Sequence, residues 1–340
     1  MPRPAADGFV GRSRRDVLRL TGLGALALTA TACVSTACGS TAEQPAAPST
    51  PPPAGQRWGA FIPSVVPSDS GRSPITQLTA LAGSAPAYLH RFCAIGDAVP
   101  TADLDAIAAA GATPLLTLEP WRPDSGLVQP EFALSRIAAG AFDTELTRWG
   151  RGLAEWGKPV LLRFAQEMNG TWYPWAVGVN GTTAADYRAA FGRVRSVITA
   201  QGAAQVRFVW APNAITLGTN PFADAFPGAD QVDVLGLDGY NWGEAPGHHW
   251  QAAGDLFTPS LEALRSLDRE HPILITEVAS ADGPTPDQKA AWIRDFFGIV
   301  HSQPRVEGFV WFQTDKERDW RFNSSSASLE AFRAGVAALR

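Results

Sequence analysis

Residues 159–175 read Pro-Val-Leu-Leu-Arg-Phe-Ala-Gln-Glu-Met-Asn-Gly-Thr-Trp-Tyr-Pro-Trp, and this stretch decides the fold. It begins as a short apolar run, typical of a strand covered on both faces, and stops at the carboxylate of Glu167. Amides flank the acid at Gln166 and Asn169, and a glycine and three aromatic residues follow. The stretch therefore predicts a buried strand that carries an acid to a rim of aromatic side chains.

Seven other short apolar runs alternate with amphipathic helical stretches, so the chain repeats a strand–helix unit. The expected strands are residues 58–63, 87–92, 113–119, 160–166, 206–212, 232–237, 273–277 and 308–313, and the expected helices include 101–110, 184–200, 259–269 and 286–300. Apolar strands separated by helices indicate a parallel sheet covered on both faces. Eight units favour a (β/α)8 TIM barrel over a doubly wound open sheet, and no glycine-rich phosphate loop follows the first strand.

The barrel is expected to form a single catalytic domain over residues 57–340, preceded by a targeting segment and a linker. Residues 1–38 resemble a twin-arginine export signal, because Arg14-Arg15 precedes an apolar stretch that is too short to span a bilayer. Residues 39–56 are rich in Pro, Ala, Ser and Thr, a composition that cannot bury a core, and are expected to be a disordered linker.

Two cysteines near the end of the export signal leave its fate open. Cys33 and Cys38 each follow small residues, as at a lipoprotein processing site. Either cysteine could carry a lipid that tethers the protein to a membrane, or the whole signal could be cut away. Both outcomes predict an exported protein, either extracellular or anchored at the cell surface as a lipoprotein.

Composition excludes several classes of partner. The formal net charge is −5 and the chain shows no basic patch, so we expect no nucleic-acid partner. The spacing of Cys33, Cys38 and Cys93 fits no zinc site, and Cys93 follows an apolar run as a small buried residue would. Adjacent histidines such as His248-His249 rarely bind one ion, so we expect neither a metal nor a cofactor. We also expect the protein to be a monomer.

Barrel active sites form at the carboxyl ends of the strands, and two of these strands end in a carboxylate. Alternation predicts that Arg163, Ala165 and Glu167 share one face, and that Ile273, Ile275 and Glu277 do the same. Both acids would then point into the barrel mouth. Burying an unpaired carboxylate there costs several kcal/mol of folding free energy. The plainer alternatives are a surface Glu167 and a Glu277 that caps the next loop.

Two carboxylates in one cleft are the machinery of glycoside hydrolysis, and other strand ends supply candidate sugar contacts. Some contacts have an equally good structural explanation: a turn for Asn169, packing of the loop for Trp172 or Trp175, and a loop cap for Asn213. Asp238 is expected to be a structural residue bonded to Arg163 or Arg91. The candidate substrate-binding residues are Gln166, Asn169, Trp172, Trp175, Trp311, Glu119, Trp121 and Asn213.

The segment from Arg163 to Trp175 resembles the acid/base segment of glycoside hydrolase family 26, a family of barrel glycosidases. The resemblance implies that Glu167 is the acid/base, Glu277 the nucleophile and Tyr240 the hydrogen-bond partner of the nucleophile; otherwise Tyr240 is a buried phenol. It also implies a retaining double displacement, with Trp311 as the floor of a sugar subsite. The family usually has His where this chain has Gln166.

The main activity of that family is endo-β-1,4-mannanase, with lichenase and β-1,3-xylanase also represented. We therefore expect a retaining endo-β-glycosidase that hydrolyses a β-linked polysaccharide, most simply β-1,4-mannan. Within the same clan, mixed-linkage β-glucan, β-xylan and bacterial exopolysaccharide are the alternative substrates. From another class, the alternative is a non-catalytic polysaccharide-binding lipoprotein that keeps the cleft.

Overall fold

The computed structural model describes residues 55–67, 71, 73–216 and 219–339. The expected export signal, Cys33 and Cys38, and nearly all of the expected linker lie outside this part of the chain. Within it, the helices are all too short or too polar to cross a membrane.

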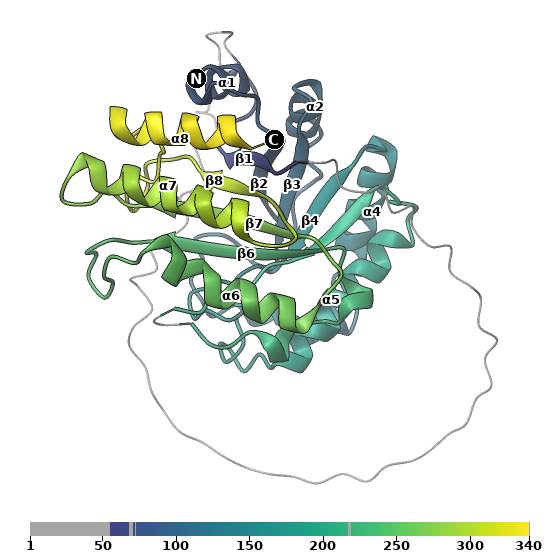
Figure 1. The fold of residues 1–340 in the computed structure, drawn as a ribbon. Coiled ribbons are helices and arrows are strands. Elements are labelled where there is room, and N and C mark those ends of the chain that lie inside the picture. Colours follow the sequence, from purple (N-terminus) through teal and green to yellow (C-terminus); the bar gives the residue numbers. More distant parts are fainter. Residues whose placement is uncertain (1–54, 68–70, 72, 217–218, 340) are drawn as a thin grey trace, which may run out of the picture.

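The described chain is a closed barrel of eight parallel strands, in which each strand pairs with the next and β8 pairs with β1 (Figure 1). The predicted (β/α)8 fold is therefore confirmed. The strands are β1 (Arg57–Phe61), β2 (Tyr88–Ala94), β3 (Thr113–Glu119), β4 (Val160–Phe164), β5 (Val206–Trp210), β6 (Val234–Asn241), β7 (Ile273–Ser280) and β8 (Val306–Phe312).

Helices lie outside the strands and cover the barrel (Figure 1). They are α1 (Pro74–Ala82), α2 (Thr101–Ala109), α3 (Leu134–Ala138), α4 (Asp143–Trp156), α5 (Ala184–Thr199), α6 (Ala253–Leu267), α7 (Pro286–Ser302) and α8 (Ser326–Ala338), with short 3-10 turns at η2 (Pro130–Phe132), η3 (Ala223–Ala225) and η4 (Ala229–Gln231).

The predicted start of α6 at Pro259 was wrong, because α6 begins at Ala253 and holds Pro259 in its interior. The prediction assumed that a proline marks the first helical turn, where its missing N–H is not needed. Here the apolar face of the helix, which includes Leu256, Phe257 and Leu261, is buried and outweighs the lost hydrogen bond.

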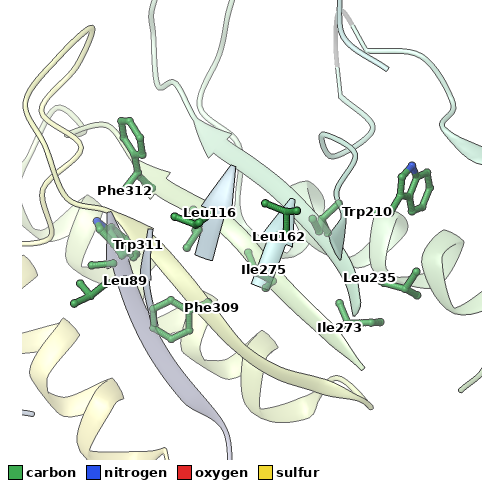
Figure 2. Close-up of a cluster of buried hydrophobic side chains, with 14 of the residues drawn as sticks. Leu89, Leu116, Leu162, Trp210, Leu235, Ile273, Ile275, Phe309, Trp311 and Phe312 are labelled. Carbon is green, nitrogen blue, oxygen red and sulfur yellow. The ribbon is translucent and has the colours of Figure 1, made fainter. Parts of the chain in front are cut away.

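Apolar side chains fill two separate layers of the barrel. A small cluster inside the strands contains Tyr88, Leu115, Leu161, Val209, Ala211, Val234, Leu274 and Val310. A larger cluster packs the outer faces of the strands against the helices, and Figure 2 shows part of it, with Leu116, Ile273, Ile275 and Trp311. The inner cluster stops below the carboxyl ends of the strands, where the interior becomes polar.

One extra residue in β7 changes which side chains face the barrel axis. Leu237 pairs with Ile275 and Asp238 pairs with Glu277, so Thr276 has no counterpart on β6. The register against β8 shifts at the same place. Such a β-bulge redirects the side chains after it. The predicted shared face of Ile273, Ile275 and Glu277 was therefore wrong: both isoleucines lie in the outer layer, whereas Thr276 and Glu277 contact groups inside the barrel.

A second bulge lies at the opposite, amino-terminal end of the barrel. Ile273 pairs with Val306 and Leu274 pairs with Gly308, so Glu307 is the extra residue on β8. The Glu307 side chain is buried near Tyr88, and burial raises the pKa of its carboxyl. This carboxylate is far from the strand ends that form the barrel mouth, which makes it a useful control position.

Candidate active site

The top of the barrel interior is a buried network of charged groups centred on Arg163 of β4. One guanidinium nitrogen, Nη1, donates to both carboxylate oxygens of Asp238, at 2.8 and 2.7 Å. Nε donates to the Thr117 hydroxyl at 2.8 Å, and Nη2 donates to Glu277. The expected contact of Asp238 with Arg163 is confirmed, and Arg91 pairs with Asp103 instead. A buried guanidinium with several fixed partners forms a rigid base for the groups above it.

His90 of β2 belongs to this network, although it was not among the predicted site residues. Its Nε2 lies 2.7 Å from the Thr117 hydroxyl and 3.2 Å from Arg163 Nη2. Burial and the nearby Arg163 and Arg91 charges hold the pKa of His90 well below its usual range. The imidazole is therefore neutral and adds no second positive charge. Burial likewise raises the pKa of Asp238, and the Arg163 charge opposes that rise.

Glu277 is held by one donor on each carboxylate oxygen. Arg163 Nη2 donates to Oε1, as an ion pair, and the Tyr240 hydroxyl donates to Oε2. Burial and the Glu277 charge raise the pKa of Tyr240 well above its usual range, so the phenol keeps its proton. The structure therefore brings Glu277 and Tyr240 together, in the contact that the family resemblance implied.

Glu167 reaches the barrel mouth by a route that strand alternation did not predict. Strand β4 ends at Phe164, and both Ala165 and Glu167 take left-handed conformations, with φ of 47° and 52°. This conformation is uncommon for residues other than glycine. The Glu167 backbone N–H is fixed by the Ala211 carbonyl at 2.8 Å. The predicted face shared by Arg163, Ala165 and Glu167 thus ends with the strand, but Glu167 is still delivered to the site.

Glu167 is also held by one donor on each oxygen. Asn213 Nδ2 donates to Oε1 and Trp172 Nε1 donates to Oε2, both at 2.5 Å. Only 1% of Glu167 is exposed. Asn213 therefore positions an acid, a role that neither sequence alternative for it included. The Trp172 ring lies so close to Gly170 that a Cβ there would be 2.5 Å from ring atom Cζ2, which explains the glycine.

Asn169 serves the loop rather than the cleft. Its Nδ2 donates to the carbonyls of Asn213 and Asn220, both at 2.9 Å, and its Oδ1 accepts the Asn213 N–H at 2.8 Å. With three backbone contacts and 2% exposure, this side chain holds the loop after β5 against the loop after β4. Asn169 thus has a structural role that differs from both the predicted sugar contact and the predicted turn.

A third buried carboxylate, Glu119 at the end of β3, also lies beside this loop. Its Oε1 accepts a hydrogen bond from Gln166 Nε2 at 2.7 Å, and its Oε2 accepts one from Trp121 Nε1 at 3.1 Å. Burial raises the pKa of Glu119 to about 7, against the opposing effect of these two donors. The expected cleft residues Glu119, Trp121 and Gln166 are thus joined in one hydrogen-bonded group.

Two of the predicted stacking platforms are buried and cannot serve as such. Trp175 stacks on Tyr173 at 4.3 Å and donates its indole N–H to the Gln166 carbonyl, so it fixes the loop after β4. Trp311 points away from the barrel axis and packs against Phe296 of α7 and Phe332 of α8. Both are at most 1% exposed. Of the predicted tryptophans, Trp172 and Trp121 remain partly exposed near the carboxylates.

Phe312, the residue after Trp311, takes the inward position that was expected of Trp311. Phe312 stacks on Phe61 of β1 at 4.6 Å and meets the Tyr240 ring edge-on at 5.7 Å. Trp320, in the segment after β8, meets the Tyr240 ring edge-on at 5.1 Å. The sequence signal for Trp311 was a tryptophan at a strand end, and it did not say which way the strand faced.

Within the described residues, no cluster of three histidine, cysteine or acidic side chains could bind a metal ion. His248 instead stacks on Trp242 at 4.9 Å, and Cys93 is buried as a reduced thiol. Fold and site together define a class: a (β/α)8 barrel whose mouth presents two buried carboxylates, Glu167 and Glu277, on separate donor pairs.

Comparison with known proteins agrees with this class. The glycosyl hydrolase family 26 model matches residues 136–292. Endoglucanase H of Acetivibrio thermocellus is 35% identical over 240 residues, which are 69% of this chain and 25% of that protein. The β-1,3-xylanase TXYA of a Vibrio species is 25% identical over 235 residues, 64% of this chain and 50% of that protein. The chain belongs to glycosyl hydrolase family 26 and spans a quarter and a half, respectively, of the lengths of these relatives.

Solved structures of the same family share the fold. The catalytic domain of an endo-β-1,4-mannanase from Bacillus sp. JAMB-750 superimposes with a TM-score of 0.64 at 15% identity, covering 84% of this chain and 86% of that one. A β-mannanase from Bacteroides ovatus gives a TM-score of 0.62 at 18% identity, covering 84% and 89%. At these identities the likeness shows the barrel architecture alone.

Proposed function

We propose that this protein is a retaining endo-β-glycosidase with Glu167 as acid/base and Glu277 as nucleophile. One observation carries the proposal: two buried carboxylates at the mouth of the barrel, each with both oxygens fixed by separate donors. A protein gains no stability from burying such groups, so their presence indicates chemistry. Family membership supports hydrolysis of a glycosidic bond as that chemistry.

The donor sets suit the two carboxylates to different steps. Glu277 forms an ion pair with Arg163 and accepts the Tyr240 hydroxyl, which orients it as an ionised nucleophile for the anomeric carbon. Glu167 would give its proton to the leaving oxygen as the bond to Glu277 forms. It would then take a proton from the water that hydrolyses the glycosyl-enzyme. Asn213 and Trp172 hold Glu167 in place for both transfers.

The substrate is proposed to be a β-linked polysaccharide, with β-1,4-mannan as the first candidate because mannanase is the main activity that the family resemblance implies. A specific observation favours a second candidate, β-glucan: the 35% identical relative is named an endoglucanase. Gln166 stands where the family usually has His, and we propose it as the residue that distinguishes mannose from glucose. β-Xylan and a bacterial exopolysaccharide complete the set to be tested.

A non-catalytic polysaccharide-binding role is less well supported. A binding cleft needs stacking faces and hydrogen bonds, but no pair of carboxylates. In this chain two of the large aromatic candidates, Trp175 and Trp311, are buried in loops and between layers, whereas both acids are held at the barrel mouth. The site therefore has few exposed aromatic faces for binding and two fixed acids, and this combination favours a catalytic role.

The decisive test combines chemistry at each acid. Glu167→Ala should abolish turnover of polysaccharide, and azide should restore cleavage of activated aryl glycosides; a lack of rescue would remove Glu167 from its role. A 2-fluoro glycosyl inactivator should label Glu277, and a label elsewhere would refute the assignment. Glu307→Gln, which alters a buried carboxylate at the other end of the barrel, is the matched control and should keep full activity.

The substrate question needs a separate screen. Mannan, glucomannan, lichenan and xylan should be incubated with the whole chain and with Glu277→Gln as the inactive control. Product lengths separate endo from exo action, and the anomer released first separates retention from inversion. Release of the inverted anomer would contradict the proposed double displacement.

We further propose that residues 1–38 direct export, that residues 39–56 form a linker, and that the barrel domain, residues 57–340, works as a monomer. These proposals rest on the twin arginines, on the composition and on the size of the barrel. Metabolic labelling with palmitate, in Cys33→Ala and Cys38→Ala variants, tests lipid attachment. Absence of label in the parent chain would favour a cleaved, extracellular form.

A further inference from the structure

The Gln166 amide is held at one end and has no hydrogen-bond partner at the other. Its Nε2 donates to Glu119 Oε1 at 2.7 Å, whereas its Oε1 is buried and accepts no hydrogen bond from the described residues. Gln166 lies between the left-handed residues Ala165 and Glu167, and its backbone carbonyl is fixed by the Trp175 indole. The side chain is therefore anchored next to the acid, with one unpartnered acceptor.

The charge of Glu119 decides which end of the amide is unpartnered. An ionised carboxylate only accepts hydrogen bonds, so it requires the NH2 end of Gln166 and leaves Oε1 without a partner. A protonated carboxyl has an O–H that can donate to the amide oxygen, which would turn the NH2 end outward. The observed contacts, one N–H donor on each Glu119 oxygen, are those of the ionised form.

We propose that Glu119 is a positioning residue that sets the orientation of the Gln166 amide, so that the sugar bound beside Glu167 meets a hydrogen-bond acceptor rather than a donor. The proposal rests on the proposed function, because it takes the ligand to be a sugar. Its physical basis is the buried Oε1, since a buried acceptor requires a donor and a sugar hydroxyl is one. Hexoses that differ in one hydroxyl would be distinguished by how well they supply that donor.

The groups around Glu119 allow both charge states near neutral pH. On its own segment Trp121 donates to it, and on β4 Gln166 donates while Arg163 lies nearby; all three lower the pKa of Glu119. Glu277 on β7 raises it, and burial, the largest effect, raises it to about 7. A single proton can therefore reverse the amide within the pH range in which glycosidases are assayed.

The first experiment reads the amide itself and does not depend on activity. Side-chain NH2 signals of the 15N-labelled chain are followed by NMR from about pH 5 to about pH 9, and Gln166 is assigned by their loss in Gln166→Met. We expect the Gln166 signals to shift with a midpoint near 7, the value to which burial raises the pKa of Glu119, and to stay constant in Glu119→Gln. That variant mimics the protonated state, because its own NH2 can donate to the Gln166 oxygen.

Two further variants make this test specific. Trp121→Phe removes an N–H that favours the ionised form, so the midpoint of the Gln166 titration should move to higher pH. Glu307→Gln removes a different buried carboxylate whose pKa is also raised, and it should leave the midpoint unchanged. Gln166 signals that do not titrate, or that titrate equally in Glu119→Gln, would overturn the proposal.

The second experiment measures discrimination. The ratio of kcat/KM for a mannan and a glucan oligosaccharide of equal length is followed against pH. The chemical steps are common to both substrates, so their dependence on pH cancels in the ratio and what remains is recognition. We expect the ratio to change about tenfold through the titration of Glu119, the effect of one mispaired polar group, and to be constant in Glu119→Gln.

The two arms separate the possible failures. If no polysaccharide is cleaved at any pH, the proposed function fails, while the NMR titration still decides whether Glu119 orients the amide. If both sugars are cleaved and their ratio is flat with pH in the parent chain, the specificity role of Glu119 is refuted and the proposed function stands.

Discussion

Replacing Tyr240 by Phe tests the proposed nucleophile with the smallest available change. The substitution removes the hydroxyl that donates to Glu277 Oε2 and leaves the ring, which packs against Phe312 and Trp320. Among the described residues, the Glu277 carboxylate then keeps the Arg163 guanidinium as its hydrogen-bond donor. Because the ring stays, any loss of activity reports the hydrogen bond rather than the packing.

The size of the effect follows from the kind of bond. A hydrogen bond to a charged group contributes about 1.5–3 kcal/mol, and each 1.36 kcal/mol is about tenfold in rate. Tyr240→Phe should therefore lower kcat/KM by about 10- to 150-fold if the bond orients the attacking oxygen in the transition state. The melting temperature should fall as well, because Glu277 Oε2 loses its donor in a buried site, so activity is measured on protein shown to be folded.

The assay is steady-state hydrolysis of an aryl glycoside with a good leaving group, where attack by Glu277 needs little help from the acid. Tyr88→Phe is the matched control: it removes the same atom from a buried tyrosine of the inner cluster, on the amino-terminal side of the barrel. That variant should keep its kcat/KM. An unchanged kcat/KM in Tyr240→Phe, or an equal loss in both variants, would refute the reasoning.

Three other substitutions have outcomes that the structure specifies. Trp311→Ala should lower the free energy of unfolding by about 3–5 kcal/mol, as for a large buried aromatic, and leave the kcat/KM of folded enzyme nearly unchanged; urea unfolding and kinetics check this. Gly170→Ala should displace the Trp172 indole from Glu167 and reduce kcat about tenfold or more, with a small stability change; a normal kcat would show that the indole contact is dispensable. Burial raises the pKa of Glu119 from 4.5 to about 7, so the folded chain holds this proton more tightly than the unfolded chain. The resulting stability is complete below about pH 4.5 and is lost as pH rises through about 7, and the parent chain should lose about 3 kcal/mol relative to Glu119→Gln over that range. Equal pH profiles of unfolding in the two chains would contradict this.

The barrel itself was predictable because its signal is repeated. Seven of the eight strands are followed by an α-helix, whereas β5 is followed by the 3-10 turns η3 and η4. An irregularity in one unit, or an error such as the start of α6 at Pro259, leaves the strand count intact. The approximate position of each acid followed from the same rule, since carboxyl ends of parallel strands meet at one end of the barrel. Glu167 and Glu277 were found for that reason.

The directions of the side chains were less predictable, because they depend on single-residue irregularities. The extra residue Thr276 exchanges the faces of β7 just before Glu277, and the left-handed turns at Ala165 and Glu167 end the alternation of β4. Nothing in an apolar run marks either feature. The same limit explains Trp311, whose strand-end position was correct and whose direction was not.

The roles of Asn213, Trp172 and Thr117 were missed for a different reason. Asn213 and Trp172 contact Glu167 from the loops after β5 and β4, and Thr117 on β3 contacts Arg163 at the paired position of the neighbouring strand β4. Such contacts join residues whose separation in the sequence carries no pattern. A polar residue at a strand end can therefore be selected as belonging to the site, while its role, binding sugar or holding an acid, emerges only from the folded chain.

The left-handed backbone at Glu167 has a consequence for engineering. A residue with a side chain is strained by about 1 kcal/mol or more in this conformation, and glycine is not. Glu167→Gly would relieve this backbone strain and would also abolish turnover of polysaccharide, at the cost of the Asn213 and Trp172 hydrogen bonds. A campaign that selects variants of this barrel by heat resistance alone does not register that loss of activity, so any such selection must carry an activity screen at every round.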